Sequence, residues 1–188
     1  MKVAIAQLNF TVGDVAGNMR KIKEKCTSAA EQRADLVVFS EMSVTGYPPR
    51  DLLEQQWLLG ASRRALDELA TESNRWGDLG IVVGGPVETM DSTGTGLFNA
   101  ALLIHQGEVK ARRPKALLPT YDVFDETRYF DSAPDTAVVL HKGERLGLTI
   151  CEDALFAPGL SSDRVYDVDP VTALAAQGGT AFINISAS

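Results

Sequence analysis

Toward its carboxyl end the chain reads Leu146-Gly147-Leu148-Thr149-Ile150-Cys151-Glu152-Asp153, a short apolar run that ends in a thiol followed by two acids. A continuous apolar run of this length is typical of a strand that is covered on both faces of its sheet. The sequence therefore predicts that Cys151 stands where a buried strand reaches the surface. Functional side chains are commonly held at such points, on loops that a rigid scaffold positions.

Six more runs of the same kind predict strands, so the expected fold class is α/β. Most of them are continuous rather than alternating, which favours strands packed on both sides. Because helical patterns separate the first three, parallel crossovers are expected there. The predicted strands are Val3–Leu8, Leu36–Ser40, Gly80–Val87, Leu97–Ile104, Ala137–Leu140 and Thr180–Ile185, in addition to Arg145–Ile150.

Two helices and one hairpin complete this outline. Asn18 is expected to cap a helix that ends near Ala34, because apolar residues recur after it at spacings of three and four. A second helix is expected from Asp51, or a later residue, to about Asn74. The pair Gln106-Gly107 lies between two strand-like runs and predicts a tight β-hairpin turn.

Length and charge limit the class of protein. The chain has 188 residues, which favours one domain over residues 1–188. Its formal net charge of −7 and pI near 4.8 argue against binding to nucleic acid or to an anionic membrane. The amino-terminal apolar stretch is too short for a signal peptide and no apolar run reaches about 18 residues, so the cytoplasm is expected. With two cysteines and two histidines, neither a disulfide framework nor a structural metal site is expected.

Two further polar residues follow strand-like runs and suit Cys151 chemically. Glu41 follows Leu36–Ser40, and Lys115 follows the strand-like Ala101–Ile104. A carboxylate can take the thiol proton while an ammonium stabilises a developing oxyanion, so the three groups together are suited to acyl transfer. We therefore expect three strand ends to converge on one pocket.

Plainer interpretations of these residues stay open on the sequence alone. Cys151 could be a small buried hydrophobe, which is the role expected of Cys26 on the apolar face of the first helix. Glu41 could be a surface glutamate, and the basic cluster around Lys115 could be a solvated edge. Glu126 could order Lys115 or simply form a surface ion pair.

Two other chemistries lack support in the sequence. Ser92–Gly96 has neither the glycine spacing nor the following lysine of a phosphate-binding loop, so a turn is expected there. His105 and His141 are far from any Ser/Asp pattern, and a serine-histidine triad is therefore not expected.

Three segments carry a family resemblance: Phe39-Ser40-Glu41, Lys115 followed by Leu117-Leu118-Pro119, and Ile150-Cys151-Glu152-Asp153. Together they resemble the nitrilase or carbon-nitrogen hydrolase superfamily, whose catalytic set is Glu, Lys and Cys in that order. Four longer segments are Thr45–Pro49 with Asp51–Leu53, Leu118–Tyr121 with Val123–Glu126, Cys151–Asp153, and Asn184–Ser188. More narrowly, these look like the glutaminase domain of glutamine-dependent NAD synthetases.

The resemblance implies a nitrilase-type α-β-β-α sandwich with mixed sheets, C-terminally incomplete because such domains continue for further strands and helices. It implies that Glu41 is the general base, that Lys115 stabilises the tetrahedral intermediate, and that Cys151 attacks the glutamine side-chain amide to form a thioester. Supporting positions that it implies are Glu126 near the lysine, Tyr121 in a loop that lines the pocket, and Ser186 and Ser188 near the glutamine. Glu152 adjoins the nucleophile, so its backbone N–H is expected as a second oxyanion donor.

The resemblance also implies partners and cofactors. Ammonia from L-glutamine would travel to a synthetase domain of the same longer chain and amidate ATP-activated deamido-NAD. ATP and Mg are therefore expected in that absent domain, and no cofactor or metal in this one. A homo-oligomer is expected by analogy. Two alternatives are a free-standing nitrilase-family amidase or carbamoylase acting on another small amide, and an inactive, truncated interaction module.

Overall fold

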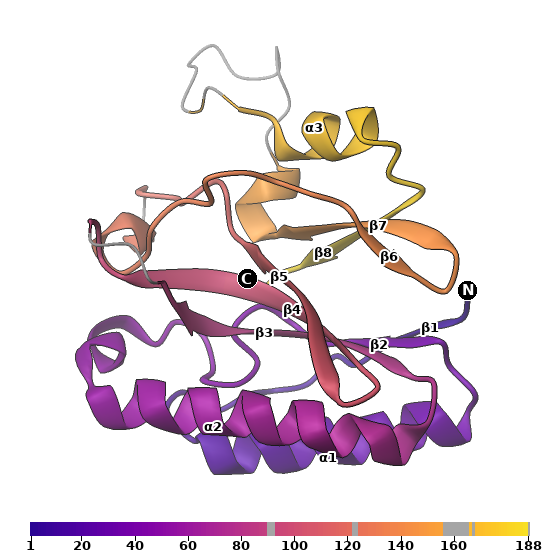
Figure 1. Ribbon diagram of the computed structural model, residues 1–188. Helices are drawn as coiled ribbons and strands as arrows, with labels where there is room; N and C mark the ends of the chain where they lie inside the picture. The colour runs from indigo at the N-terminus through magenta and orange to yellow at the C-terminus, as the bar shows by residue number, and fades with distance from the viewer. Residues whose placement is uncertain (90–92, 122–123, 156–165, 167, 188) are drawn as a thin grey trace.

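The computed structural model describes residues 1–188 except 90–92, 122–123, 156–165, 167 and 188. Four layers are stacked in it: a pair of helices, a five-stranded sheet, a three-stranded sheet and a short third helix (Figure 1). This arrangement confirms the expected α-β-β-α sandwich. Each sheet is covered on one face by the other sheet and on its outer face by helix. Strand residues can therefore be buried on both sides, as the continuous apolar runs predicted.

Five strands form the larger sheet in sequence order, namely β1 (Val3–Ile5), β2 (Leu36–Val38), β3 (Gly80–Glu88), β4 (Leu97–His105) and β5 (Glu108–Pro114). β1, β2 and β3 are parallel, as expected for strands joined by helices, whereas β3, β4 and β5 are antiparallel. The β4–β5 hairpin turns at Gln106 and Gly107, whose φ angles of 48° and 83° are those of the predicted tight turn. The sheet is therefore mixed.

Three strands form the smaller sheet, namely β6 (Val139–His141), β7 (Glu144–Ile150) and β8 (Ala181–Ile185). β6 and β7 are antiparallel, whereas β7 and β8 are parallel and are connected through the helix α3 (Pro170–Ala176). Aliphatic side chains on the facing sides of the two sheets pack into one cluster, which brings the ends of β2 and β7 close together. Its buried members include Leu36, Val38, Val82, Leu103, Leu146, Leu148 and Ile150.

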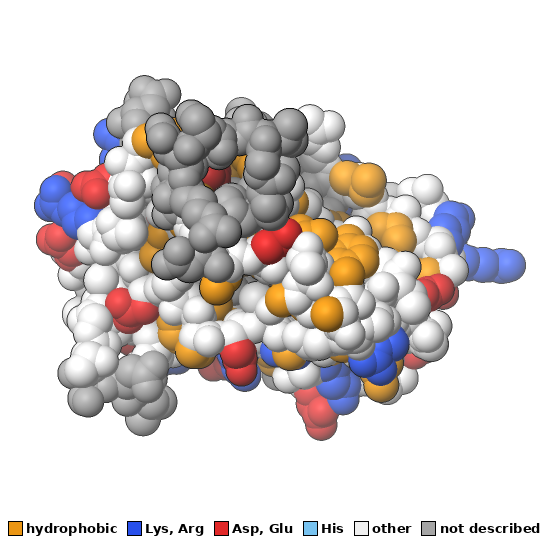
Figure 2. All heavy atoms as spheres, turned by 90° about the horizontal axis from the view of Figure 1, so that it is seen from above, with side chains coloured by type: hydrophobic (Ala, Val, Ile, Leu, Met, Phe, Trp, Pro, Cys, Tyr) orange, Lys and Arg blue, Asp and Glu red, His pale blue; other side chains and the backbone are white. Residues whose placement is uncertain are grey.

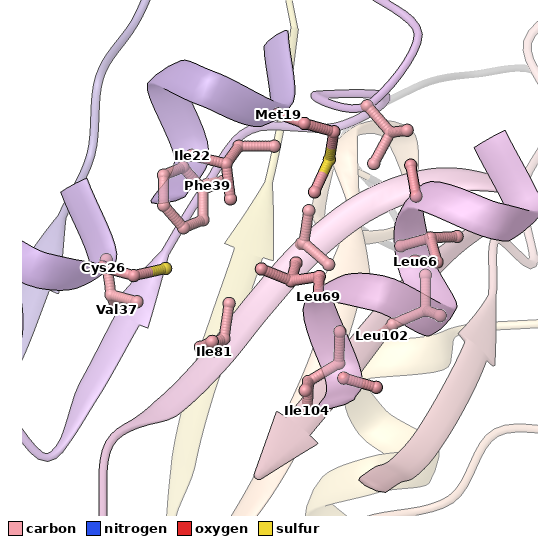
Figure 3. Packing of buried hydrophobic residues seen from close by; sticks show 14 of the residues in the cluster. Met19, Ile22, Cys26, Val37, Phe39, Leu66, Leu69, Ile81, Leu102 and Ile104 are labelled. Atoms are coloured by element: carbon pink, nitrogen blue, oxygen red, sulfur yellow. The ribbon is translucent and has the colours of Figure 1, made fainter. Parts of the chain in front are cut away.

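Two long helices, α1 (Val15–Glu31) and α2 (Gln56–Glu72), cover the outer face of the larger sheet (Figure 1). Alternate strand residues point toward them, because successive side chains of a strand face opposite sides. Figure 3 shows Met19, Ile22, Cys26, Leu66 and Leu69 of the helices with Val37, Phe39, Ile81, Leu102 and Ile104 of the sheet side. Cys26 has no exposed surface, which confirms its expected place in the core.

The start of α1 differs from the expected one. Asp14, and not Asn18, is the N-cap, since its carboxylate accepts a hydrogen bond from the Gly17 N–H at 2.9 Å. Asn18 lies inside the helix with no exposed surface. Its side-chain amide hydrogen-bonds the backbone of Thr11 and Val44 and so ties the helix to the loop after β2. Asparagine suits both a cap and such a bridge, which is why the spacing alone led to the wrong residue.

Strand boundaries also differ in ways that affect the site. β2 ends at Val38 rather than Ser40, where the chain turns toward Glu41. Lys115 follows β5, the return strand of the hairpin, and not the apolar run of residues 101–104, which lies inside β4. Short 3₁₀ helices complete the fold at Arg50–Glu54, Ser73–Trp76, Glu126–Arg128 and Cys151–Ala154.

The described part of the chain contains no helix that is long and apolar enough to cross a membrane. Figure 2 looks onto the face that carries α3, where acidic and basic side chains are interspersed with apolar ones. The expected absence of nucleic-acid and membrane partners stays a prediction from charge.

Candidate active site

Cys151 is held at a sharp change of backbone direction. It follows the last residue of β7 and begins the 3₁₀ helix Cys151–Ala154. Its φ angle is 45°, in the left-handed region that residues other than glycine seldom adopt. The residue is only 9% exposed. Backbone strain of this kind clusters at functional sites, which favours a chemical role over simple packing.

Glu41 lies in the turn after β2, pressed against β3. A Cβ at Gly84 would lie 2.5 Å from the Met42 nitrogen and 2.8 Å from the Glu41 Cα, so glycine is needed for this close approach. Ser43 fixes the contact, because its hydroxyl accepts the Gly84 N–H at 3.2 Å and donates to the Gly84 carbonyl oxygen at 3.3 Å. The turn thereby buries the Glu41 side chain, which is not the surface glutamate that the sequence left open.

Three donors surround the Glu41 carboxylate. Oε1 accepts hydrogen bonds from Asn99 Nδ2 at 2.7 Å and from Lys115 Nζ at 2.9 Å. Oε2 accepts the backbone N–H of Ala187, in the chain after β8, at 3.2 Å. Asn99 also positions the lysine backbone, since the backbone carbonyl oxygen of Asn99 accepts the backbone N–H of Lys115 at 2.8 Å. The orientation of Glu41 is therefore fixed by residues from both sheets.

The ammonium of Lys115 lies between two buried carboxylates. Nζ is 2.9 Å from Glu41 Oε1 and 2.8 Å from Glu126 Oε2, and the lysine side chain has no exposed surface. Burial by itself lowers the pKa of Lys115, but the charges of Glu41 and Glu126 outweigh it and hold the pKa above its usual range. Lys115 is therefore a fixed cation, and the solvated basic edge that its sequence neighbours allowed is excluded.

Glu126 completes this charged cluster. The residue is 5% exposed, so it orders Lys115 from the interior and does not form a surface ion pair. Burial raises the pKa of Glu126, and the charge of Lys115 acts in the opposite direction. The hydroxyl of Tyr47 donates to Glu126 Oε1 at 3.0 Å. Burial and the charge of Glu126 raise the pKa of Tyr47, which keeps the phenol a neutral donor.

The Cys151 thiol is protonated at rest. Burial raises its pKa, and the charges of Glu41 and Glu126 act in the same direction. A hydrogen bond with Ser186 and the charge of Lys115 act the other way without reversing the shift. Because the thiolate is the nucleophilic form, a thiol in these surroundings needs a neighbouring base.

Glu152 and Tyr121 lie at the rim of the same site. The Tyr121 hydroxyl donates to Glu152 Oε2 at 2.7 Å, and this bond raises the pKa of Tyr121 to about 12. Burial and the charge of the same carboxylate raise the pKa of Tyr166 to about 12. Glu152 is 9% exposed whereas Tyr121 is 49% exposed, so the pair reaches from the interior to solvent.

The structure brings together all but one of the site residues that the sequence suggested: Glu41, Lys115, Cys151, Glu126, Glu152, Tyr121 and Ser186. The remaining one, Ser188, lies outside the described residues. Three contributors were missed, namely Asn99, Tyr47 and Asp153. Asn99 had a usable signal, because it is the polar residue within an otherwise apolar strand, Leu97–Ile104.

A cavity of about 320 Å³ adjoins the cluster. Tyr47 and Glu126 belong both to the cluster and to the wall of this cavity. The other residues of the wall are Pro48, Pro49, Arg50, Asp51, Leu53, Phe124, Asp125, Arg128, Tyr129 and Phe130. Among the described residues, no three His, Cys, Asp or Glu side chains are grouped so that they could hold a metal ion.

Known proteins similar to this chain were found by sequence. Glutamine-dependent NAD(+) synthetase of Synechocystis sp. is 38% identical over 189 residues, covering 99% of this chain and 34% of that protein. The enzyme of the same name from Aquifex aeolicus is 36% identical over 188 residues, covering 100% of this chain and 30% of that protein. The chain thus spans about a third of the length of these relatives.

Solved structures agree in fold. The glutamine-dependent NAD+ synthetase from Acinetobacter baumannii superposes with a TM-score of 0.85 at 30% identity, covering 99% of this chain and 32% of that one. An amidase from Nesterenkonia sp. superposes with a TM-score of 0.78 at 25% identity, covering 100% of this chain and 65% of that one. A family model described as carbon-nitrogen hydrolase matches residues 2–160. With its buried glutamate and lysine beside a strained cysteine, the chain belongs to the carbon-nitrogen hydrolase family.

Proposed function

We propose that this chain is the glutaminase part of a glutamine-hydrolysing NAD(+) synthetase. The observation that carries the proposal is the Lys115 ammonium, held between the buried carboxylates of Glu41 and Glu126 within electrostatic reach of the Cys151 thiol. The similarity to glutamine-dependent NAD(+) synthetases over 99–100% of the chain supports glutamine as the substrate. A cysteine paired with a base and a cation is suited to acyl transfer from an amide.

In the first half of the reaction Cys151 Sγ attacks the side-chain amide carbon of glutamine. Glu41 accepts the thiol proton, which the raised pKa of Cys151 makes necessary. The negative charge that develops on the amide oxygen is stabilised by the ammonium of Lys115 and by the backbone N–H of Glu152. The protonated Glu41 then gives its proton to the amide nitrogen, the C–N bond breaks, ammonia leaves and a glutamyl thioester remains.

In the second half water hydrolyses the thioester. Glu41 is again the base and takes a proton from the attacking water, while Lys115 and the Glu152 N–H stabilise the second oxyanion. When the C–S bond breaks, the proton returns from Glu41 to Cys151 Sγ and glutamate is released. Glu126 keeps Lys115 in place during both halves, since its carboxylate lies 2.8 Å from the ammonium.

The rim residues are proposed to bind the remainder of the glutamine. Glu152 offers a carboxylate to the substrate ammonium, and Tyr121 and Ser186 offer hydroxyls. Ser188 is proposed for the same loop. Within the longer protein, the ammonia would be used by a synthetase domain that requires ATP and Mg, whereas this part needs no cofactor. A homo-oligomer in the cytoplasm is the corresponding expectation for the whole enzyme.

The proposal is tested by measuring ammonia and glutamate release from L-glutamine by this chain and by Cys151→Ala. A diazoketone analogue of glutamine is used in parallel, and the labelled residue is located by mass spectrometry. Release and labelling that both vanish in Cys151→Ala support the glutaminase. Cys26→Ala is the control, because Cys26 is buried in the core between the helices and the larger sheet and does not touch the charged cluster of Glu41, Lys115 and Glu126.

Two outcomes would count against the proposal. Hydrolysis of other small amides, with glutamine neither cleaved nor trapped, favours a free-standing amidase or carbamoylase. A folded chain whose Cys151 reacts with no substrate analogue favours the inactive interaction module. Labelling of Cys151 without turnover supports glutamine binding and indicates that the rest of the longer protein is needed for the reaction.

A further inference from the structure

One buried carboxylate connects the two segments that carry the lysine and the nucleophile. Asp153 Oδ1 accepts the backbone N–H groups of Ala116 at 3.0 Å and Leu117 at 2.8 Å. Its Oδ2 accepts the backbone N–H of Ile150 at 3.0 Å. The first two donors directly follow the residue that bears the ammonium, and the third directly precedes the residue that bears the thiol.

We propose that Asp153 is a positioning residue whose carboxylate ties the segment after Lys115 to the turn at Cys151, and so holds the ammonium and the thiol at a fixed separation. The proposal rests on the proposed function insofar as it concerns glutamine turnover. The geometry itself concerns only the relative placement of Lys115 and Cys151.

The tie is needed because the two segments come from different sheets. Lys115 follows β5 of the larger sheet, and Cys151 follows β7 of the smaller one. Hydrogen-bonded strand pairing fixes neighbours within a sheet, whereas the facing sheets meet mainly through non-directional packing of aliphatic side chains, with hydrogen bonds at a few points such as His141 to the Asp35 carbonyl oxygen. The hydrogen bonds to Asp153 fix the orientation of the two segments relative to each other at the point where the reaction takes place.

The same side chain fixes the turn of the nucleophile. Its bond to the Ile150 N–H closes the 3₁₀ helix Cys151–Ala154, in which Cys151 has its left-handed φ of 45°. Such a backbone conformation persists only when surrounding contacts impose it. Asp153 is 3% exposed and therefore does so without competition from solvent.

The three N–H groups donate to both oxygens of Asp153, and only the ionised carboxylate leaves both oxygens free of a proton to accept them. Burial raises the pKa of Asp153 to about 6, while its bonds to Leu117, Ile150 and Ala116 and the charge of Lys115 act in the opposite direction. The group is therefore ionised near neutral pH although its burial opposes ionisation. A buried carboxylate that these three bonds keep ionised fits a role in placing the reacting groups.

Asp153→Asn is the first variant to make. An asparagine side chain has one acceptor oxygen and one NH₂ donor, so its NH₂ must face at least one N–H and one of the two segments is released. Asp131→Asn is the matched control, because Asp131 likewise accepts two turn N–H groups, from Thr95 at 2.8 Å and Gly96 at 2.9 Å, but has no contact with the cluster. Asp153→Ser is a second variant, whose small hydroxyl avoids the donor-donor clash yet cannot reach both segments.

Two readouts separate positioning from loss of folding. The first is the rate at which iodoacetamide alkylates Cys151 as a function of pH, resolved by peptide mass from Cys26. Cys26 has no exposed surface and reports unfolding. The second is kcat and KM for glutamine. Alkylation does not involve glutamine, so it tests Asp153 even when the proposed function fails.

We expect Asp153→Asn and Asp153→Ser to lower kcat by about 100-fold with little change in KM, the effect of misplacing reacting groups by about 1 Å. The alkylation profile of Cys151 should move to higher pH, because the Lys115 charge that lowers the thiol pKa is displaced. Asp131→Asn should leave both unchanged. An unchanged profile would overturn the proposal. A shift of the profile to lower pH would also overturn it, because that is the effect of removing the negative charge of Asp153 alone. The same holds if labelling of Cys26 rises in step with the loss of kcat in both variants, since that would indicate unfolding.

Discussion

The ammonium of Lys115 lies 2.9 Å from the carboxylate of Glu41, and neither side chain has exposed surface. Removing one member of a buried ion pair leaves the other charge unsatisfied, which typically destabilises a protein by about 3–5 kcal/mol. In this site the loss would leave two carboxylates, Glu41 and Glu126, facing each other without a cation. The lysine is therefore expected to matter for folding as well as for chemistry.

Lys115→Met is expected to abolish measurable turnover and to lower the free energy of unfolding by about 3–5 kcal/mol. The loss of stability should shrink at acidic pH, because protonation of the carboxylates removes their repulsion. Urea denaturation at several pH values measures this. Lys110→Met is the control: Lys110 lies on β5, the strand that precedes Lys115, and among the described residues its ion pair is with exposed Glu108. Its replacement should change stability by less than about 0.5 kcal/mol. Equal effects of the two variants would contradict the prediction.

Glu41→Gln separates the base from the framework. Glutamine keeps an acceptor for Asn99 and Lys115 but cannot accept the thiol proton, so turnover should fall about 10²–10⁴-fold. Stability should fall less than in Lys115→Met, because Glu126 still neutralises the ammonium, although the new NH₂ faces the Ala187 N–H that Glu41 accepted. Alkylation of Cys151 at high pH, where hydroxide removes the proton, should persist. Turnover within a few-fold of the wild type would mean that another group is the base.

Two neighbouring glycines of β3 test how Glu41 is placed. Gly84→Ala should lower turnover strongly, because its Cβ would lie 2.5 Å from the Met42 nitrogen and push the Glu41 turn away from the sheet. Gly85→Ala should be tolerated, since its Cβ would lie 3.4 Å from the Val44 side chain. Steady-state kinetics of both variants, with circular dichroism to verify folding, make the comparison. Similar activities would show that the close approach at Gly84 is dispensable.

The two cysteines should differ in their response to pH. Burial raises the pKa of Cys151, so its alkylation rate should keep rising about tenfold per pH unit beyond pH 8.5, the usual value for a free thiol. Burial raises the pKa of Cys26 to about 12 and covers it completely, so it should not react in the folded chain. A rate for Cys151 that levels off below about pH 8 would indicate a stable thiolate and remove the need for Glu41 as the base.

His141 should contribute a loss of stability as the pH falls below about 6.5, which Asp153 opposes below about pH 6 because burial raises its pKa to about 6. Burial lowers the pKa of His141, whereas the unfolded chain has a histidine pKa of about 6.5. The unfolded state then binds more protons, so the stabilisation is present above pH 6.5 and is lost as the pH falls, by at most about 1.4 kcal/mol per unit for one group. His141→Gln keeps a donor for the Asp35 carbonyl oxygen and should flatten this dependence. If the free energy of unfolding depends on pH as before, another group takes up the protons, for example His105, which contacts the His141 ring.

Much of the fold followed from local patterns. The hairpin at Gln106-Gly107 was predictable because few residue pairs suit two consecutive left-handed φ angles. The continuous apolar runs marked strands covered on both faces. The cap of α1 was misplaced at Asn18, since the tertiary contacts with Thr11 and Val44 that occupy its amide are invisible in the sequence. Asp153 was seen only as an acid beside the thiol, and its role depends on backbone donors more than thirty residues away.

The sequence by itself determined the residue types that end the strands and the family to which they point: a glutamate, a lysine and a cysteine at Glu41, Lys115 and Cys151. Only the tertiary structure decided how they act on one another. Glu41 and Lys115 are 74 residues apart, and their contact exists because two antiparallel strands return Lys115 to the end of β2. Burial there removes water, and that desolvation, together with two facing carboxylates, sets the charge of the ammonium and keeps the thiol protonated.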